Sequence, residues 1–192
     1  MARIAFIVDQ MFEDSELRIP YDRVKAAGHQ PVIIGVEAGK RLDGKKHKET
    51  ITTELSVKDV SPDEFDALVI PGGYSPDLLR MSQPMVGFVR SFFNANKPIA
   101  AICHAGWMLV EADVADGRTV TSWPSIKTDL INAGARWVDR EVVEDGNLIT
   151  SRKPDDLPAF SDALLRQLEQ GVASRTVPLA PEAASEQPPL RH

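Results

Sequence analysis

The feature that most constrains this chain is an alternation between short apolar runs and longer stretches with helical spacing. The apolar runs are residues 3–8, 31–35, 65–73 and 98–103. The helical stretches are residues 12–27, 84–97 and 104–112. Short apolar runs of this kind are typical of strands that are covered on both faces. Strands that alternate with helices indicate βαβ units, so we expect an α/β fold with a mostly parallel sheet and helices on both faces.

The C-terminal third has a different organisation. Residues 141–152 contain two apolar runs around Asp145-Gly146-Asn147, which predicts a β-hairpin. Residues 157–170 predict a last helix, whereas residues 176–192 hold four prolines and show no apolar periodicity. We therefore expect one domain over residues 1–172 and a disordered tail over 173–192.

Composition limits the function classes. The net charge is −6 and the isoelectric point about 5.2, which disfavours a nucleic-acid partner because phosphate binding needs a basic face. The basic stretch 39–48 is rich in Gly and Lys, which favours a solvated loop or hairpin over a phosphate site. A single cysteine fits a reducing compartment. The apolar run before Asp9 is too short for a signal sequence or a membrane span, so we expect a soluble cytoplasmic protein with no membrane partner.

Three loops follow the predicted strands and carry chemically useful side chains. They are residues 9–14, residues 71–77 and the segment that begins at Cys103. In an open parallel sheet, ligands bind outside the carboxyl ends of the strands, where the strand order reverses. We expect these loops to meet at one edge of the sheet.

Cys103 lies where a strand gives way to a helix, with Ala101 and Ala105 two residues away on either side. A strand–nucleophile–helix elbow needs small residues at these positions because its backbone turns sharply. A helix N-terminus would also favour the thiolate. A buried structural cysteine remains the alternative at this point.

Only one histidine is placed to act as a base. His192 lies in the predicted tail, His47 in the basic loop, and His29 precedes a strand at the opposite edge of the sheet. His104 directly follows Cys103, so their contact depends on the strained turn.

The other two loops supply carboxylates and backbone donors. An ionised Glu13 near the sulfur would raise the thiol pKa, whereas a protonated Glu13 would donate a hydrogen bond and lower it. The alternative is helix N-terminal charge, with Asp14 as the N-cap. Gly72 and Gly73 can present N–H groups to an oxyanion or form a plain turn. Asp77 either begins a helix or orients His104. The cysteine and histidines show no metal-ligand spacing.

The sequence resembles the DJ-1/PfpI superfamily, in particular its branch of PfpI-like intracellular proteases and general stress proteins. The matching segments are FEDSEL, EFDALVIPGG, KPIAAICHAG and NAGARWVDREVVEDGNLITSRKPDDLPAF, which together run from about residue 3 to 170. Because several separated motifs agree in order and spacing, the resemblance is specific.

The resemblance implies a flavodoxin-like three-layer sandwich with Cys103 as nucleophile, Glu13 hydrogen-bonded to its sulfur and His104 as base. Gly73 and His104 would supply the oxyanion N–H groups, and Asp77 would complete the triad across a subunit interface. It also implies a dimer or higher homo-oligomer without a cofactor. Its members are described as peptidases, as deglycases or glyoxalase III-like enzymes, and as chaperones or oxidation sensors.

Two departures from the family pattern concern specificity. The run His-Gly-Pro-Gln, common after the cysteine, is His104-Ala105-Gly106-Trp107 here. We expect Gly72 and Trp107 to contact substrate, with Trp107 changing the bulk of the pocket. Asp77 stands where the family often has Glu, one methylene longer.

Two functions compete. The first is a cofactor-free cysteine hydrolase or lyase acting on small carbonyl compounds, their protein adducts or peptides. The second is a stress protein whose Cys103 is oxidised rather than turning over substrate. A glutamine amidotransferase shares the elbow but needs a later His-x-Glu, which is missing.

Overall fold

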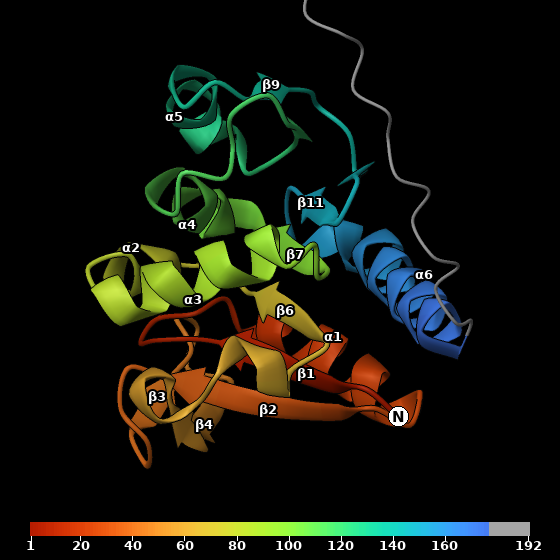
Figure 1. Ribbon diagram of the computed structural model, residues 1–192. Helices are drawn as coiled ribbons and strands as arrows, with labels where there is room; N and C mark the ends of the chain where they lie inside the picture. The colour runs from red at the N-terminus through yellow and green to blue at the C-terminus, as the bar shows by residue number, and fades with distance from the viewer. Residues whose placement is uncertain (177–192) are drawn as a thin grey trace, which may run out of the picture.

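The computed structural model describes the backbone of residues 1–176 and the side chains of residues 1–171. A seven-stranded sheet with the order β10-β11-β7-β6-β1-β2-β5 forms its centre (Figure 1). The strands are β1 (Arg3–Ile7), β2 (Gln30–Gly35), β5 (Leu55–Ser56), β6 (Ala67–Ile70), β7 (Ile99–Ile102), β10 (Val142–Asp145) and β11 (Leu148–Ser151). All neighbours are parallel except β10 and β11. The predicted mostly parallel sheet is therefore confirmed.

Six α-helices and two small ribbons surround this sheet within the described residues. The helices are α1 (Asp14–Ala26), α2 (Ser75–Leu79), α3 (Gln83–Asn94), α4 (Gly106–Glu111), α5 (Lys127–Asn132) and α6 (Leu157–Thr176). The ribbons are antiparallel β3 (Arg41–Asp43) with β4 (Thr50–Thr52), and parallel β8 (Thr119–Val120) with β9 (Arg136–Trp137). The domain end predicted at 172 falls inside α6, and residues 177–192 of the predicted tail lie outside the described residues.

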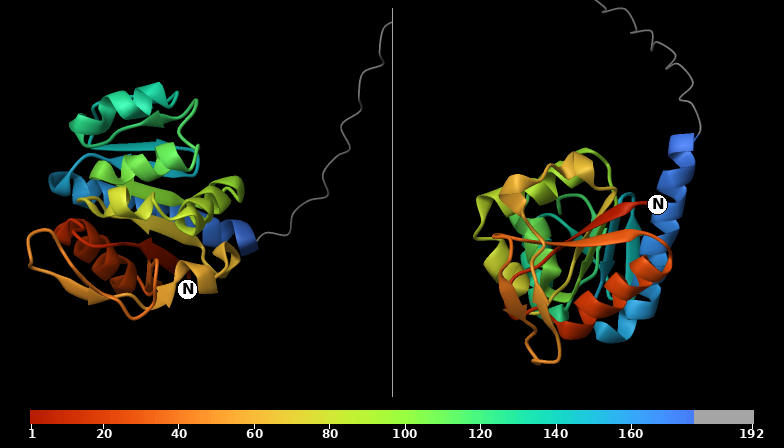
Figure 2. Two further views of the ribbon diagram at one scale, coloured as in Figure 1. Left: turned by 90° about the vertical axis from the view of Figure 1, so that its left-hand side faces the viewer. Right: turned by 90° about the horizontal axis from the view of Figure 1, so that it is seen from below.

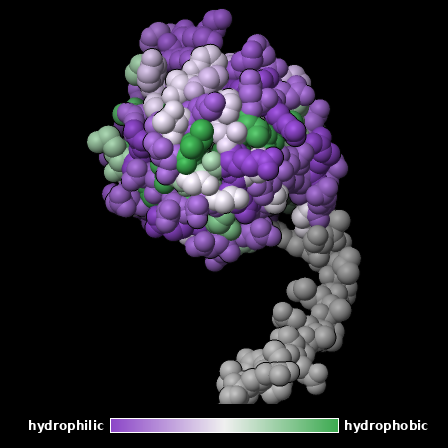
Figure 3. Space-filling model, turned by 90° about the horizontal axis from the view of Figure 1, so that it is seen from above, coloured by the Kyte–Doolittle hydropathy of each residue, from purple (hydrophilic) through white to green (hydrophobic). Residues whose placement is uncertain are grey.

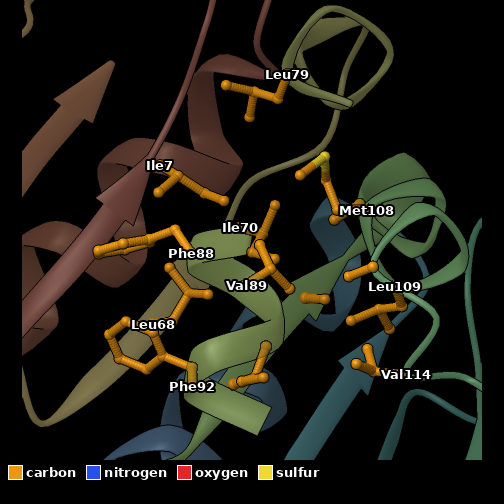
Figure 4. Packing of buried hydrophobic residues seen from close by; sticks show 14 of the residues in the cluster. Ile7, Leu68, Ile70, Leu79, Phe88, Val89, Phe92, Met108, Leu109 and Val114 are labelled. Atoms are coloured by element: carbon orange, nitrogen blue, oxygen red, sulfur yellow. The ribbon is translucent and has the colours of Figure 1, made fainter. Parts of the chain in front are cut away.

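Two hydrophobic clusters make the molecule a three-layer sandwich. Ala5 and Ile7 of β1 point into a cluster with α3 and α4, part of which Figure 4 shows. Ile4 and Phe6 point to the other face, against α1 and α6. Side chains alternate between the two faces of a strand, so both faces of β1 are buried, as its continuous apolar run predicts. The predicted helices on both faces are confirmed.

Helices α1 and α6 form the second helical layer, and an ion pair joins them. Helices α1 and α6 lie side by side (Figure 2, right). Arg23 Nη2 on α1 lies 2.6 Å from Asp162 Oδ1 on α6. Gly28 ends the α1 segment with φ +81°, a conformation that glycine adopts without strain.

The predicted hairpin forms, with Val142 opposite Ser151 and Asp145 opposite Leu148. However, it is not a separate unit, because β11 also pairs in parallel with β7 and so extends the main sheet. The elements between residues 112 and 140, β8, α5 and β9, were not predicted, because their short segments show no clear apolar period.

The topology brings the three predicted loops to one edge. The chain runs from β1 to β2 on one side and returns to β6 on the other, so the strand order reverses at β1 and β6. An isolated antiparallel bridge joins Phe12, after β1, to Gly73, after β6. Cys103 follows β7, which is the next strand beyond β6. The expected convergence of these loops is confirmed.

In the view of Figure 3 hydrophobic residues appear only in small groups on a predominantly hydrophilic face. Within residues 1–176, none of the helices has the length and apolar character that crossing a membrane requires.

Candidate active site

Cys103 occupies a strained turn between β7 and the short 3₁₀ segment Cys103–Ala105. Its φ is +64°, in the left-handed region that costs an L-residue about 1–2 kcal/mol. Its small neighbours Ala101 and Ala105 are both buried. Strained backbone of this kind is typical of functional sites, because the surrounding structure must hold it in place. The geometry is that of the elbow predicted from the A-x-C-x-A pattern.

Backbone donors surround the sulfur. The N–H groups of Gly73 and His104 both donate hydrogen bonds to the Cys103 side chain. Gly73 reaches this position with φ +79°, and a Cβ there would lie 2.5 Å from both Glu13 N and Met11 O. These are the two donors predicted for an oxyanion, and they lie where charge on the sulfur or on an attached oxygen would be stabilised.

His104 lies between the thiol and a serine. Its Nδ1 is 3.2 Å from Cys103 Sγ, and its Nε2 is 3.2 Å from Ser125 Oγ. Burial, and then the charge of Lys45, lower the pKa of His104. The imidazole is therefore neutral at physiological pH and free to accept the thiol proton. Ser125 was not predicted, because it comes from the segment between residues 112 and 140, which shows no clear apolar period.

Glu16, and not Glu13, is the carboxyl group beside the nucleophile. Its side chain is fully buried, its Oε2 accepts the Gly72 N–H at 2.8 Å, and it forms a hydrogen bond with Cys103. Burial, together with the charge of Glu13, raises the pKa of Glu16 to about 8. Glu16 is thus protonated near neutral pH and can donate a hydrogen bond to a thiolate.

The expectation that Glu13 contacts the sulfur is wrong. Its Oε2 lies 2.6 Å from Lys45 Nζ and its Oε1 lies 2.6 Å from Lys46 Nζ. Burial alone would raise the pKa of Glu13, but the hydrogen bonds and charges of the two lysines outweigh it and hold the pKa below its ordinary value. Glu13 is the N-cap residue of α1, so a carboxyl group one turn further along the helix faces the thiol instead.

Asp14 is also placed differently from the prediction. It is the first residue of α1 and not its N-cap. Its buried carboxylate accepts three backbone N–H groups from the loop between β3 and β4. These hydrogen bonds hold the pKa of Asp14 down, although burial acts in the opposite direction.

The thiol itself is not acidified in the resting structure, contrary to the expectation from a helix N-terminus. Burial, and then the charge of Glu16, raise the pKa of Cys103 to about 12. The second contribution disappears when Glu16 is protonated. The N–H groups of Gly73 and His104 act in the opposite direction but do not offset burial. The six residues of α4 provide only a short helix behind the sulfur.

Asp77 does not reach His104 within one chain. It lies in α2, where its Oδ1 pairs with Arg80 Nη2 at 2.6 Å, and its side chain is 49% exposed. The histidine nitrogens face Cys103 and Ser125 instead. A triad completed by Asp77 of a second subunit therefore remains a prediction.

The two residues expected to contact substrate have contacts within the chain. The N–H of Gly72 is taken by Glu16, and a Cβ on Gly72 would lie 2.6 Å from Cys103 Cβ. Trp107 donates from Nε1 to Asp129 Oδ2 at 2.8 Å, and its ring centroid lies 5.0 Å from that of His104. The Trp107 ring therefore packs beside the His104 ring. Its contact with substrate remains a prediction.

Residues 2–167 match the DJ-1/PfpI family. The chain belongs to this family. It is 47% identical to protein/nucleic acid deglycase 2 of Escherichia coli, over 86% of this chain and 97% of that protein. It is 44% identical to general stress protein 18 of Bacillus subtilis, over 88% of this chain and 98% of the relative. The deglycase PfpI of Pyrococcus furiosus is 43% identical, over 87% of this chain and 99% of its own length.

Solved structures of DJ-1/PfpI proteins share the fold. A two-domain protein of Anabaena variabilis with DJ-1/ThiJ/PfpI-like and ferritin-like domains aligns with a TM-score of 0.86 at 37% identity, covering 87% of this chain and 50% of that one. Drosophila melanogaster DJ-1beta aligns with a TM-score of 0.80 at 29% identity, covering 93% and 99%. The flavodoxin-like sandwich implied by the resemblance is thereby confirmed.

In this DJ-1/PfpI chain, the segment FEDSEL contains both Glu13, which was expected to contact the sulfur, and Glu16, which faces it. Glu13 and Glu16 are three residues apart and share a helix face, so their roles depend on where α1 begins. Among the side chains of residues 1–171, no group of three or more His, Cys, Asp or Glu could hold a metal ion.

Proposed function

We propose that the chain is a cysteine-dependent hydrolase or lyase that acts on reactive carbonyl compounds or on their protein adducts. The observation that supports this most strongly is the surroundings of Cys103, whose strained turn places the sulfur against two N–H donors and 3.2 Å from His104 Nδ1. Relatives across nearly the whole chain are named deglycases, and another is named a putative cysteine protease. Carbonyl carbon is the electrophile common to these activities.

The first chemical step follows from the geometry. As the sulfur attacks the carbonyl carbon, a C–S bond forms and the C=O π electrons move onto the oxygen. The thiol proton passes to His104 Nδ1, which returns it to that oxygen or to the leaving group. The N–H groups of Gly73 and His104 stabilise the negative charge on the sulfur or the oxygen. Protonated Glu16 stabilises the thiolate by donating to it.

Replacing the nucleophile tests this proposal. We expect Cys103→Ala to abolish turnover of methylglyoxal or of a methylglyoxal adduct, measured as release of the hydroxy acid. Equal activity in the variant would refute a cysteine mechanism. Trp107→Phe is a useful companion, because it removes the hydrogen bond to Asp129 while leaving the thiol in place.

A second candidate is an oxidation sensor. Glu16 Oε1 is buried without a nitrogen or oxygen partner, so it is placed to donate to an oxygen of a Cys103 sulfinate. The burial and raised pKa of the thiol act against rapid oxidation. Intact mass after mild peroxide decides between the two. A stoichiometric gain of two oxygens on Cys103 would support sensing, whereas an unmodified thiol with good turnover would support the enzyme.

The assembly and location stay predictions. We propose a homo-oligomer in the cytoplasm, in which α2 of one subunit brings Asp77 to the site of another. The exposed Tyr74, Leu78 and Met81 on and beside α2 support contact with a second copy there.

A further inference from the structure

The basic loop between β3 and β4 is more than a solvated hairpin. The sequence favoured a solvated loop or hairpin for residues 39–48, and this stretch holds β3 and most of the turn that leads to β4. However, Asp14 accepts the backbone N–H groups of Lys46, Lys48 and Glu49 at 2.8–2.9 Å. Lys45 N also donates to Phe12 O at 2.8 Å. These hydrogen bonds hold the backbone of the loop against the start of α1.

Two of these lysines converge on one buried carboxylate. Lys45 Nζ and Lys46 Nζ each lie 2.6 Å from an oxygen of Glu13, whose side chain is 2% exposed. Their own side chains are 31% and 50% exposed. Two ammonium groups share one carboxylate in this contact, so the three groups together carry one positive charge. The neighbouring Asp14 carboxylate faces the loop backbone, where it accepts the N–H groups of Lys46, Lys48 and Glu49.

This surplus charge lies near the nucleophile. Lys45 Nζ lies 2.6 Å from Glu13 Oε2, and Glu13 N donates to Gly72 O at 3.1 Å. The next residue, Gly73, donates to the sulfur. The charge of Lys45 acts on Cys103, lowering the pKa of the thiol, and on His104. The Lys46 side chain is the more exposed of the two, at 50% against 31% for Lys45. Lys45 is therefore the inner cation and Lys46 the outer one.

We propose that Lys45, with Lys46 behind it, forms an anion subsite that selects small carbonyl compounds bearing a carboxylate next to the reactive carbon. Glu13 then acts as a positioning residue that holds both ammonium groups at the mouth of the site. Glyoxylate is the simplest compound of this class. The substrate part of this proposal rests on the proposed function, but the subsite can be tested without turnover.

Alkylation of Cys103 by iodoacetate and by iodoacetamide isolates the charge effect. In both reactions the sulfur forms a bond to the CH₂ carbon and iodide leaves with the C–I electrons. The reagents have nearly the same size and differ in charge. The ratio of their rate constants therefore reports anion preference, because a changed thiol pKa alters both rates equally.

We expect Lys45→Gln to lower the iodoacetate-to-iodoacetamide ratio by about threefold to fivefold, the range of a partly exposed ion pair. Lys45→Arg should keep the ratio, and Lys46→Gln should lower it less. Lys48→Gln is the matched control, since Lys48 lies in the same loop and contributes only its backbone to the contacts with Asp14. An unchanged ratio in Lys45→Gln overturns the subsite.

If Lys45→Gln does not fold, the same ratio of rate constants is measured on the wild-type protein at increasing salt concentration. A ratio that falls with salt supports the subsite, and a constant ratio overturns it. Turnover of glyoxylate and methylglyoxal then separates the two proposals. A changed alkylation ratio without any turnover leaves the subsite standing and refutes the reaction. Methylglyoxal turnover with an unchanged alkylation ratio supports the reaction and refutes the subsite.

Discussion

Glu16 and Cys103 meet across Gly72, at a point where the backbone has no room for a side chain. A Cβ on Gly72 would lie 2.5 Å from Glu16 Oε2 and 2.6 Å from Cys103 Cβ. The carboxyl group and the thiol are consequently buried together and exchange protons as a pair.

The pH dependence of Cys103 alkylation should show the coupling. The pKa of Glu16 is raised to about 8 and that of Cys103 to about 12, so the pair loses its first proton near pH 8. We expect the rate with iodoacetamide to rise up to about pH 8 and then flatten, because one negative charge is shared between the two groups. In Glu16→Gln the step near pH 8 should vanish, because the variant has no carboxyl group to ionise. The thiol should then ionise at a lower pH than it does in the wild type, where an ionised Glu16 lies beside it. A two-step profile in this variant would contradict the coupling. Asp22→Asn, a surface change on α1, serves as control.

Filling the space at Gly72 should damage both stability and activity. In Gly72→Ala, the added methyl group also meets Ile102 O at 2.9 Å, so we expect a loss of about 1–3 kcal/mol in the free energy of unfolding. Gly87→Ala is the matched control, because a Cβ there has no neighbour within 4 Å and Gly87 lies inside α3. That variant should gain about 0.5–1 kcal/mol. Urea unfolding measures the stability of both variants. Equal effects of the two substitutions on the free energy of unfolding would mean that the space at Gly72 is unimportant.

Ser125 should act through the orientation of His104. Removing the hydroxyl 3.2 Å from Nε2 leaves the imidazole without a partner on that side. We expect Ser125→Ala to lower kcat by about fivefold, the equivalent of a hydrogen bond worth about 1 kcal/mol, with a shifted pH profile. Ser91→Ala, on the exposed side of α3, should leave both unchanged. A wild-type profile for Ser125→Ala would show that His104 is held by other contacts.

Subunit complementation tests the proposed role of Asp77. Asp77→Ala and Cys103→Ala should each be inactive alone. After verified subunit exchange in a dimer, the mixture should recover about a quarter of the wild-type rate, because half of the dimers then carry one complete site of two. No recovery would place Asp77 outside the catalytic group, in its ion pair with Arg80.

The sequence predicted the scaffold and the nucleophile because both depend on local patterns. Continuous apolar runs gave β1, β2, β6 and β7, and small residues around Cys103 indicated the turn. Glu13 was expected beside the sulfur and Glu16 was missed, since the carboxyl group that faces the thiol depends on the residue at which α1 begins. The contacts of Lys45 and Ser125 could not be predicted either, because each joins segments that are distant in sequence and carry no periodic pattern. Sequence patterns thus located the site but did not assign all of its side chains.

The burial of Glu16 links proton uptake to folding. Its pKa is raised from 4.5 to about 8, so between these values the folded chain holds a proton that the unfolded chain has lost. Stability therefore falls as pH rises through this interval, by an amount on the order of a few kcal/mol in total. The protein should be most resistant to unfolding in mildly acidic solution. The carboxyl group that prepares the thiol for reaction thus makes the fold weaker at the pH where the reaction would run.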